Sequence, residues 1–212
     1  MLRAGLTGGI ATGKTTVGIM FIELGCHLLD ADRITHELFR PGEPVYTAVV
    51  QAFGENILSP DRTINRNVLG EIVFSDPQAR TKLNGIVHPA VVQRQRDWLN
   101  EMEAKDPDGI GIVDAALMIE VGTYRNYDKV IVVTCTPDVQ KQRLRARSRL
   151  SEEQIEARIR SQMPLEEKVK YADFVIENSA DLGNARRQVA EVTSRLRELA
   201  GNTSGTRRPS RA

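Results

Sequence analysis

Residues 8–15 read Gly-Gly-Ile-Ala-Thr-Gly-Lys-Thr, a complete match to the pattern G-x-x-x-x-G-K-[ST]. The apolar run at residues 2–6 predicts a short buried strand before it. The apolar spacing over residues 14–24 predicts a helix after it, which Gly25 ends. A glycine-rich turn between a strand and a helix directs backbone N–H groups and the positive helix end at one point. The stretch therefore predicts a binding site for nucleotide phosphates.

Two side chains of this loop carry chemistry of their own. The Lys14 ammonium can reach the β- and γ-phosphates, and the Thr15 hydroxyl is placed to bind Mg²⁺. The alternative is a glycine turn followed by an incidental lysine, and the flanking strand and helix argue against it. We therefore predict an ATP site with Mg²⁺ as cofactor.

Four further apolar runs predict strands, at residues 26–29, 110–113, 130–133 and 174–176. Continuous apolar strands separated by helical stretches are typical of a parallel sheet covered by helices on both faces. The sequence therefore predicts an α/β fold of the P-loop type, a three-layer sandwich around a five-stranded parallel sheet.

Two regions interrupt this alternation. Residues 37–103 are mostly helical in pattern and lack an obvious core strand, so we interpret them as a helical insertion that binds the acceptor. Residues 138–170 are strongly charged, and their helical pattern breaks near Ser148 and Pro164, so we interpret them as a helical lid. Both belong to a single predicted domain, residues 1–200, whose core comprises residues 1–36, 104–137 and 171–200.

Residues 201–212 consist mainly of Gly, Ser, Thr, Arg and Pro without periodicity, which predicts a disordered tail. The chain of 212 residues has a net charge of +1, which gives no reason to expect nucleic acid or an anionic membrane as a partner. No apolar run is long enough to cross a membrane, and the N-terminus lacks secretory features. Cys26 and Cys135 are expected to be reduced core residues, and we expect a cytoplasmic protein.

Two other nucleotide-binding classes fit poorly. A dinucleotide-binding oxidoreductase would have G-x-G-x-x-G after the first strand, and the loop does not match it. A GTPase would have D-x-x-G after a strand and N-K-x-D for guanine. Residues 106–109 match the first of these but precede a strand, and N-K-x-D is absent from the sequence.

Acidic residues follow two of the predicted strands. Asp30 and Asp32 end the second strand, and parallel strands end at the same edge of a sheet as the loop, so Asp32 is a candidate base for an attacking hydroxyl. Its alternative role is to cap a helix that begins at Arg33. Asp114 ends the third strand and is a candidate Mg²⁺ ligand, or else a residue that only starts the next turn.

The predicted lid contains several arginines, of which most are expected to be solvated. Arg143 and Arg147 lie one helical turn apart and directly before the break at Ser148, so one of them is a candidate to stabilise charge on the transferring phosphoryl group. His88 precedes Pro89, and this pair is expected to open a helix, with Pro89 in its first turn and His88 as a cap.

The ordered set of motifs resembles the dephospho-coenzyme A kinases over residues 2–199. The segments that carry the resemblance are residues 5–10 (GLTGGI), 30–32 (DAD), 83–89 (LNGIVHP), 117–120 (LMIE), 162–168 (QMPLEEK) and 172–179 (ADFVIENS). The resemblance implies that ATP phosphorylates the ribose 3′-hydroxyl of dephospho-coenzyme A, the last step of coenzyme A synthesis. It also implies a nucleoside-monophosphate-kinase-like fold.

Functional residues carry over by position in these motifs. The catalytic residues would be Lys14, Asp32 and Arg147. The acceptor would be bound by Asp32, His88, Leu117 and Glu120. ATP would be bound by Gly8, Gly9, Ala11, Thr12, Gly13, Lys14, Thr15, Thr16, Arg143, Asn178 and Ser179, with the last two near the adenine.

Two positions depart from the family pattern. Many members carry Pro near the end of the third strand, where this chain has residues 114–116 (DAA), and Gly-Ser is frequent where it has Ala11-Thr12. The first departure adds an acidic Mg²⁺ partner or changes the acceptor wall, and the second is expected to have little effect.

The predicted partners are the two substrates, and no oligomeric state is predicted. Two other functions remain open. A sister kinase acting on a nucleoside monophosphate or another small hydroxyl compound would use the same loop and lid, although the context of His88 favours the coenzyme A precursor. A non-catalytic ATP-binding switch protein would bind ATP without acceptor-dependent release of ADP.

Overall fold

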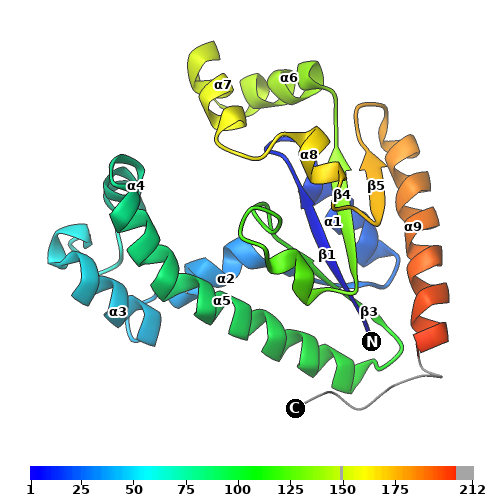
Figure 1. Cartoon of the computed structure of the whole chain (residues 1–212), viewed down its shortest axis with the longest axis horizontal. Helices are drawn as coiled ribbons and strands as arrows, with labels where there is room; N and C mark the ends of the chain where they lie inside the picture. The colour runs from blue at the N-terminus through cyan, green and yellow to red at the C-terminus, as the bar shows by residue number, and fades with distance from the viewer. Residues whose placement is uncertain (149, 204–212) are drawn as a thin grey trace. The chain divides into compact units, whose positions relative to one another are not determined.

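The computed structural model describes residues 1–148 and 150–203, and it confirms the predicted α/β fold with a five-stranded parallel sheet (Figure 1). The sheet has the order β2-β3-β1-β4-β5, so the strand that leads into the loop at residues 8–15 is central. The strands are β1 (Leu2–Gly8), β2 (His27–Asp30), β3 (Ile110–Asp114), β4 (Lys129–Thr134) and β5 (Phe174–Glu177).

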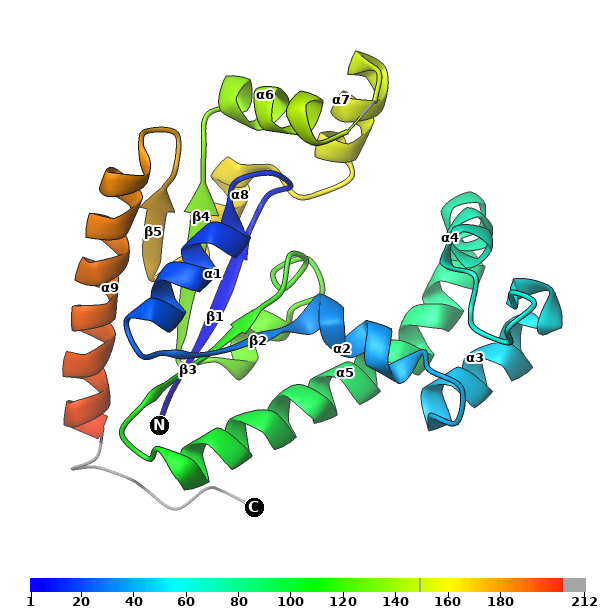
Figure 2. The same ribbon diagram turned by 180° about the vertical axis from the view of Figure 1, so that it is seen from behind.

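Helices cover both faces of this sheet. On one face α1 (Lys14–Glu23) and α9 (Leu182–Thr203) pack into a core that includes Leu6, Ile131 and Val133. On the other face Val130 and Val132 pack against the region of α8 (Leu165–Val169). Figure 2 shows α1 in front of the sheet, whereas Figure 1 shows α8 in front from the opposite side. Alternate residues of β4 thus face different layers, as the three-layer prediction requires.

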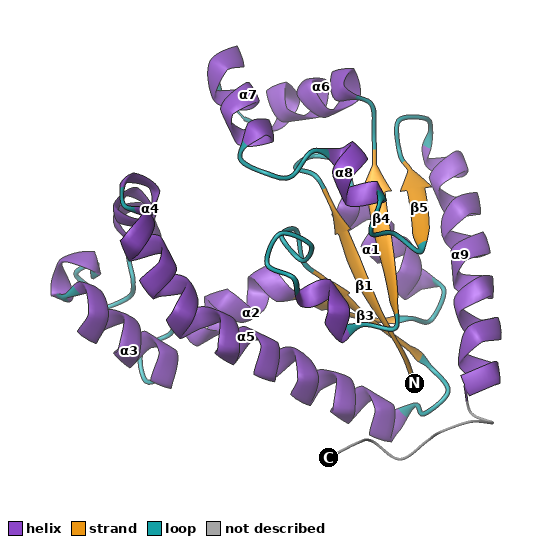
Figure 3. Cartoon of the chain, in the orientation of Figure 1, coloured by secondary structure: helices purple, strands orange, loops and turns teal. Residues whose placement is uncertain are grey.

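Residues 30–98 form a separate compact unit, and residues 1–29 and 99–203 belong to the other. The separate unit consists of helices and loops (Figure 3). Its helices are α2 (Ala31–Leu38), α3 (Pro44–Phe53), α4 (Arg66–Ser75), the 3₁₀ turn η1 (Glu55–Ile57) and the part of α5 (Pro77–Lys105) up to residue 98. The helical pattern expected for this region is therefore confirmed.

The expected helix start at His88-Pro89 is wrong. Both residues lie inside α5, which begins eleven residues before His88 at Pro77. The Asp76 carboxylate accepts a hydrogen bond of 2.7 Å from the Gln78 amide, so Asp76 and Pro77 provide the start signal that His88 and Pro89 were expected to give. A proline inside a helix still removes one backbone hydrogen bond, which is why the pair resembled a boundary.

Three helices follow β4: α6 (Pro137–Arg147), α7 (Glu152–Arg160) and α8, and a 3₁₀ turn, η2 (Thr123–Asn126), precedes it. The breaks predicted near Ser148 and Pro164 are present, since α6 ends at Arg147 and Pro164 caps α8. Ser151 and Gln154 form a capping box that starts α7. Arg149 of the predicted lid lies outside the described residues.

The last helix, α9, continues to Thr203, three residues into the segment that was predicted as a disordered tail. Residues 204–212 of that segment lie outside the described part of the chain. Among the described residues, none of the helices combines the length and apolar content that crossing a membrane needs.

Candidate active site

The loop at residues 8–15 connects the central strand β1 to α1, as the motif predicts. Gly13 has a φ of 92°, and a Cβ atom there would collide with the Asn178 side chain, so glycine is required on both counts. A Cβ atom at Gly8 would lie 2.5 Å from the Val133 carbonyl oxygen. Ala11 has a φ of 58°, a left-handed conformation that side chains rarely adopt. The backbone of the loop is therefore held in a constrained curve.

The Lys14 ammonium forms an ion pair with the carboxylate of Asp114. The register of the sheet explains this, because Asp114 pairs with Leu6 and so lies on the strand beside the start of the loop. The side chains of Lys14 and Asp114 are only 15% and 8% exposed. The predicted phosphate-binding lysine and the predicted metal ligand are thus brought together, in a contact that the sequence motifs did not indicate.

The carbonyl and amide groups of the loop's outer side are held by side chains from distant segments. Ile10 is held at both ends, because its carbonyl accepts a bond of 2.7 Å from Gln140 and its amide donates one of 2.7 Å to Gln162. The Thr12 carbonyl accepts bonds of 3.0 Å from Arg143 and 2.8 Å from the Asn178 side chain. Gln140 and Asn178 are themselves buried. The loop is therefore supported before any ligand binds.

Sequence reasoning missed two of these supports. Gln140 stands in a charged helix and carries no local signal of its role. Gln162 is the first residue of the QMPLEEK segment, which carries part of the family resemblance but predicts no function for Gln162. Because both contacts depend on which segments the sheet brings together, a single sequence could not predict them.

The predicted adenine-side residues lie next to the loop. Asn178 follows β5, and its amide donates a bond of 2.9 Å to the Thr134 carbonyl at the end of β4. The Ser179 hydroxyl accepts a bond of 2.7 Å from the Thr136 amide. Both residues therefore connect the ends of β4 and β5 on the side where the loop begins.

The lid arginines differ in what they contact. Besides the Thr12 carbonyl, Arg143 donates a bond of 2.7 Å to the Asn178 carbonyl, so its guanidinium is held at the loop. Arg145 forms an ion pair with Glu152 on the surface. Arg147 is exposed and is the last residue of α6. Burial of Cys135 raises the pKa of its thiol, and the Arg143 charge partly opposes this shift.

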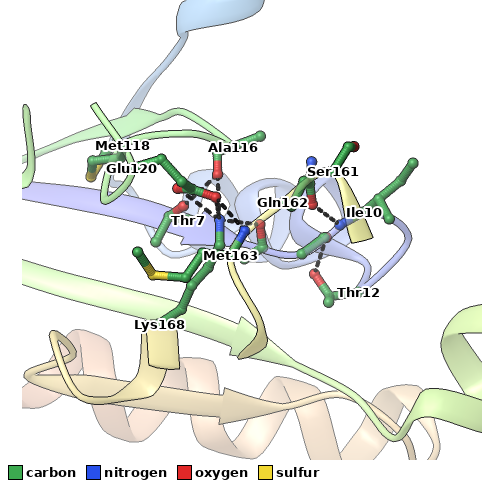
Figure 4. A network of polar contacts seen from close by, with 12 residues as sticks. Thr7, Ile10, Thr12, Ala116, Met118, Glu120, Ser161, Gln162, Met163 and Lys168 are labelled. Atoms are coloured by element: carbon green, nitrogen blue, oxygen red, sulfur yellow. Dashed lines mark hydrogen bonds and ion pairs between the residues drawn. The ribbon is translucent and has the colours of Figure 1, made fainter. Parts of the chain in front are cut away.

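Two residues predicted to bind the acceptor follow β3. Leu117 is 47% exposed and does not belong to the buried core. The Glu120 carboxylate instead forms an ion pair of 2.9 Å with Lys168 and accepts a bond of 3.1 Å from the Met163 amide (Figure 4). The Glu120 side chain remains 21% exposed, and its acceptor contact stays a prediction.

The remaining predicted residues lie in the unit of residues 30–98. Asp32 is exposed in the first turn of α2, and the helix cap is Asp30, whose carboxylate accepts a bond of 2.9 Å from the Asp32 amide. The alternative reading of Asp32 as the cap is therefore wrong, because α2 begins two residues earlier than the sequence indicated. The Asp32 carboxylate makes no hydrogen bond or ion pair to another described residue. His88 is exposed on α5.

The predicted Mg²⁺ ligands offer suitable chemistry. Thr15 is exposed in the first turn of α1, and Asp114 presents a carboxylate at the end of β3. Hydroxyl and carboxylate oxygens are the donors that Mg²⁺ prefers, and the ion often completes its shell with substrate phosphates and water. Within the described residues no group of three or more His, Cys, Asp or Glu is placed to hold a metal ion.

A constrained phosphate loop between the central strand and the first helix of a five-stranded parallel sheet defines a P-loop kinase fold. The model of the family described as dephospho-CoA kinase matches residues 2–184. The chain is 44% identical over 196 residues to the dephospho-CoA kinase of Aquifex aeolicus, covering 92% of this chain and 98% of the relative. It is 45% identical over 193 residues to that of Geobacillus kaustophilus, covering 90% and 94%.

A solved structure is also similar. The dephospho-CoA kinase from Campylobacter jejuni superimposes with a TM-score of 0.70 at 29% identity, covering 94% of this chain and 98% of the other. The chain therefore belongs to the dephospho-CoA kinase family. It is accordingly an ATP-dependent transferase of the final step of coenzyme A biosynthesis, and the predicted function agrees with this assignment.

Proposed function

We propose that this chain transfers the γ-phosphate of ATP, bound with Mg²⁺, to the ribose 3′-hydroxyl of dephospho-coenzyme A. The observation that carries the proposal is the constrained loop with Lys14 held against Asp114, in a chain whose family model covers residues 2–184. Phosphoryl transfer requires little covalent chemistry from protein groups, so positioning and electrostatics carry the catalysis.

The loop binds and orients the phosphates of ATP in this proposal. The amides of residues 11–16 surround the phosphate oxygens, helped by the N-terminal end of α1. The Lys14 ammonium, oriented by Asp114, stabilises negative charge on the transferring group. Asn178 and Ser179 line the adenine side, and Arg143 supports the loop carbonyls from α6.

Asp32 orients the attacking hydroxyl and accepts its proton. Two observations support this role: Asp32 follows the end of β2 by two residues, and its carboxylate makes no hydrogen bond or ion pair to another described residue. Because the strands of a parallel sheet all end at one edge, β2 ends at the same edge as β1, where the loop begins. Asp32 follows the end of β2 in the chain. His88 and Leu117 contribute to the acceptor site.

Arg147 enters the site from α6 when the nucleotide is bound. An exposed guanidinium at a helix end is free to adopt a new position, and it suits the charge that spreads over a transferring phosphoryl group. Thr15 and Asp114 would hold Mg²⁺ together with the phosphates, and the ion would neutralise developing charge. Closure of residues 138–170 excludes water, which protects ATP from hydrolysis.

A coupled assay of ADP release tests the proposal. The purified chain is supplied with ATP and Mg²⁺, and then with dephospho-coenzyme A, AMP or shikimate as the acceptor. We expect release of ADP that depends on dephospho-coenzyme A, with the product carrying a 3′-phosphate by mass spectrometry and ³¹P NMR. Stimulation by a different acceptor alone would point to a sister kinase, and ATP binding without stimulation would point to a switch protein.

A further inference from the structure

Lys168 is a charged residue that the proposed chemistry does not use, although its side chain is fully buried in α8. A buried ammonium is costly unless hydrogen-bond acceptors surround it. It donates bonds of 2.7 Å to the Ala116 carbonyl and 3.4 Å to the Gly8 carbonyl, and it pairs with Glu120 at 2.9 Å (Figure 4). Every acceptor thus comes from outside its own helix.

The two carbonyls belong to the segments that carry the phosphate site. Gly8 is the last residue of β1 and the first of the loop, whereas Ala116 lies two residues after Asp114, the partner of Lys14. The Thr7 hydroxyl donates a further bond of 3.1 Å to the Ala116 carbonyl. One ammonium therefore ties the start of the loop to the segment that holds the carboxylate orienting Lys14.

The segment before α8 adds two contacts of the same kind. Gln162 accepts the bond from the Ile10 amide at 2.7 Å, and the Met163 amide donates to Glu120 at 3.1 Å. Figure 4 shows Met163 and Lys168 meeting at Glu120, and Gln162 meeting Ile10. Residues 162–168 thus hold the loop at its first residue, Gly8, and near its tip, at Ile10.

Lys168 itself has no exposed surface through which to touch a ligand. An ion pair whose ammonium is fully buried is also a poor device for stability alone, because well-packed apolar residues often stabilise as much or more. We propose that Lys168, with its partner Glu120, is a positioning residue that holds the phosphate loop in its binding geometry. This proposal rests on the proposed function in one respect, since it assumes that the loop binds ATP phosphates.

The test compares Lys168→Met, which keeps an unbranched side chain one heavy atom shorter and removes its donors, with Lys170→Met as the matched control. Lys170 is the exposed residue that directly follows the same helix, and among the described residues its ammonium pairs with Glu167. Competition against a fluorescent ATP analogue gives the affinities for ATP, ADP and AMP in the presence of Mg²⁺. Thermal unfolding of each variant verifies that the protein is folded at the assay temperature.

A positioning role affects nucleotides that carry a β-phosphate. We expect Lys168→Met to weaken the affinity for ATP and ADP by at least about tenfold and the affinity for AMP by less than about twofold. The affinities of Lys170→Met should match those of the wild type. The kcat should fall by at least about tenfold, with the KM for dephospho-coenzyme A within about threefold. A lower melting temperature with unchanged ATP-to-AMP selectivity would show a purely structural role and overturn the proposal.

Two other variants keep the test decisive if Lys168→Met does not fold. Gln162→Ala removes the hydrogen bond from the Ile10 amide, and Glu120→Gln removes the charge of the partner. Each should lower the ATP-to-AMP selectivity by about threefold or more, and wild-type selectivity in both would overturn the proposal. Because these measurements need no acceptor, a wild-type chain that fails to phosphorylate dephospho-coenzyme A would refute the proposed function and leave this test intact.

Discussion

The phosphate site and the helical unit of residues 30–98 differ in how far apart in the sequence their hydrogen-bonded residues lie. Around the loop, the contact from Gln162 to Ile10 spans 152 residues of sequence, that from Lys168 to Gly8 spans 160, and that from Asn178 to Thr12 spans 166. In the helical unit, Tyr46 donates to the Arg62 carbonyl over 16 residues and Lys82 to the Ala52 carbonyl over 30.

Burial follows the same division. The described polar residues that support the loop include the buried Thr12, Asn178 and Lys168, whereas Asp32 and His88 of the helical unit are exposed. Buried polar groups with satisfied partners rigidify their surroundings, and exposed ones keep their freedom. The difference teaches that the part of the molecule that binds phosphates is organised in advance, while Asp32 and His88, two of the expected acceptor residues, stay exposed.

Lys14→Ala should show the largest effect, because it removes the ammonium from the preorganised side. We expect kcat to fall by about a thousandfold, as when a preorganised charge-stabilising donor is lost. Coupled ADP release measures the effect, with Lys105→Ala as a control because Lys105 is an exposed lysine paired with Glu101. Near-wild-type turnover of the Lys14 variant would remove the loop from the mechanism.

Asp32→Asn, in the helical unit, should lower turnover without lowering the stability of the fold. Loss of a general base lowers kcat by about a hundredfold or more. The melting temperature should stay that of the wild type, because the carboxylate is exposed and Asp30 makes the helix cap. A large loss of stability with unchanged kcat would reverse the assignment of the two aspartates.

Arg147→Ala tests whether the unit that binds the nucleotide also contains an exposed residue that acts only when a ligand binds. We expect kcat to fall by about tenfold to a hundredfold with unchanged stability, as for the loss of one charge-assisted hydrogen bond. Arg145→Ala is the matched control, since Arg145 is an exposed neighbour on α6 whose ion pair with Glu152 lies on the surface. Equal kinetics in the two variants would dismiss a role for Arg147.

The interior of the larger unit should respond to alkaline pH through Cys26. Burial raises the pKa of Cys26 to about 11, so the folded chain keeps this thiol protonated after the unfolded chain has lost the proton. The contribution of Cys26 to the free energy of unfolding is therefore full below about pH 8.5 and falls by on the order of 2 kcal/mol towards about pH 11. Urea unfolding of the wild type and of Cys26→Ala should converge by this amount with rising pH. Parallel pH dependences would contradict the assignment.

Asp30→Ala should give the smallest effect, because it removes one local cap from the helical unit. The change should lower the free energy of unfolding by about 1 kcal/mol through loss of the bonds to the Asp32 and Arg33 amides. Chemical denaturation measures it, and Asp30→Ser, which can still cap, is the control. No difference between the alanine and serine variants would show that the cap contributes nothing.

The sequence alone was enough to predict the features that depend on local patterns of residues. The loop motif, all five strands and the breaks around Ser148 and Pro164 could be identified because short runs of residues encode them. The sequence did not reveal that Lys14 meets Asp114 or that Glu120 meets Lys168, since these pairs arise from strand order and helix packing. The helix after β2 was expected to begin at Arg33 but begins at Ala31, so Asp30 and not Asp32 is the cap. A sequence pattern places a helix boundary only to within a few residues.

The lengths of the strands have a consequence for solubility. Both outer strands, β2 and β5, have only four residues, whereas the central strand β1 has seven. An outer strand exposes unpaired amides and carbonyls that can recruit a strand from another chain, and a short one offers few of them. The sheet therefore narrows towards its margins, which limits edge-to-edge aggregation even though Val175 on β5 is 42% exposed.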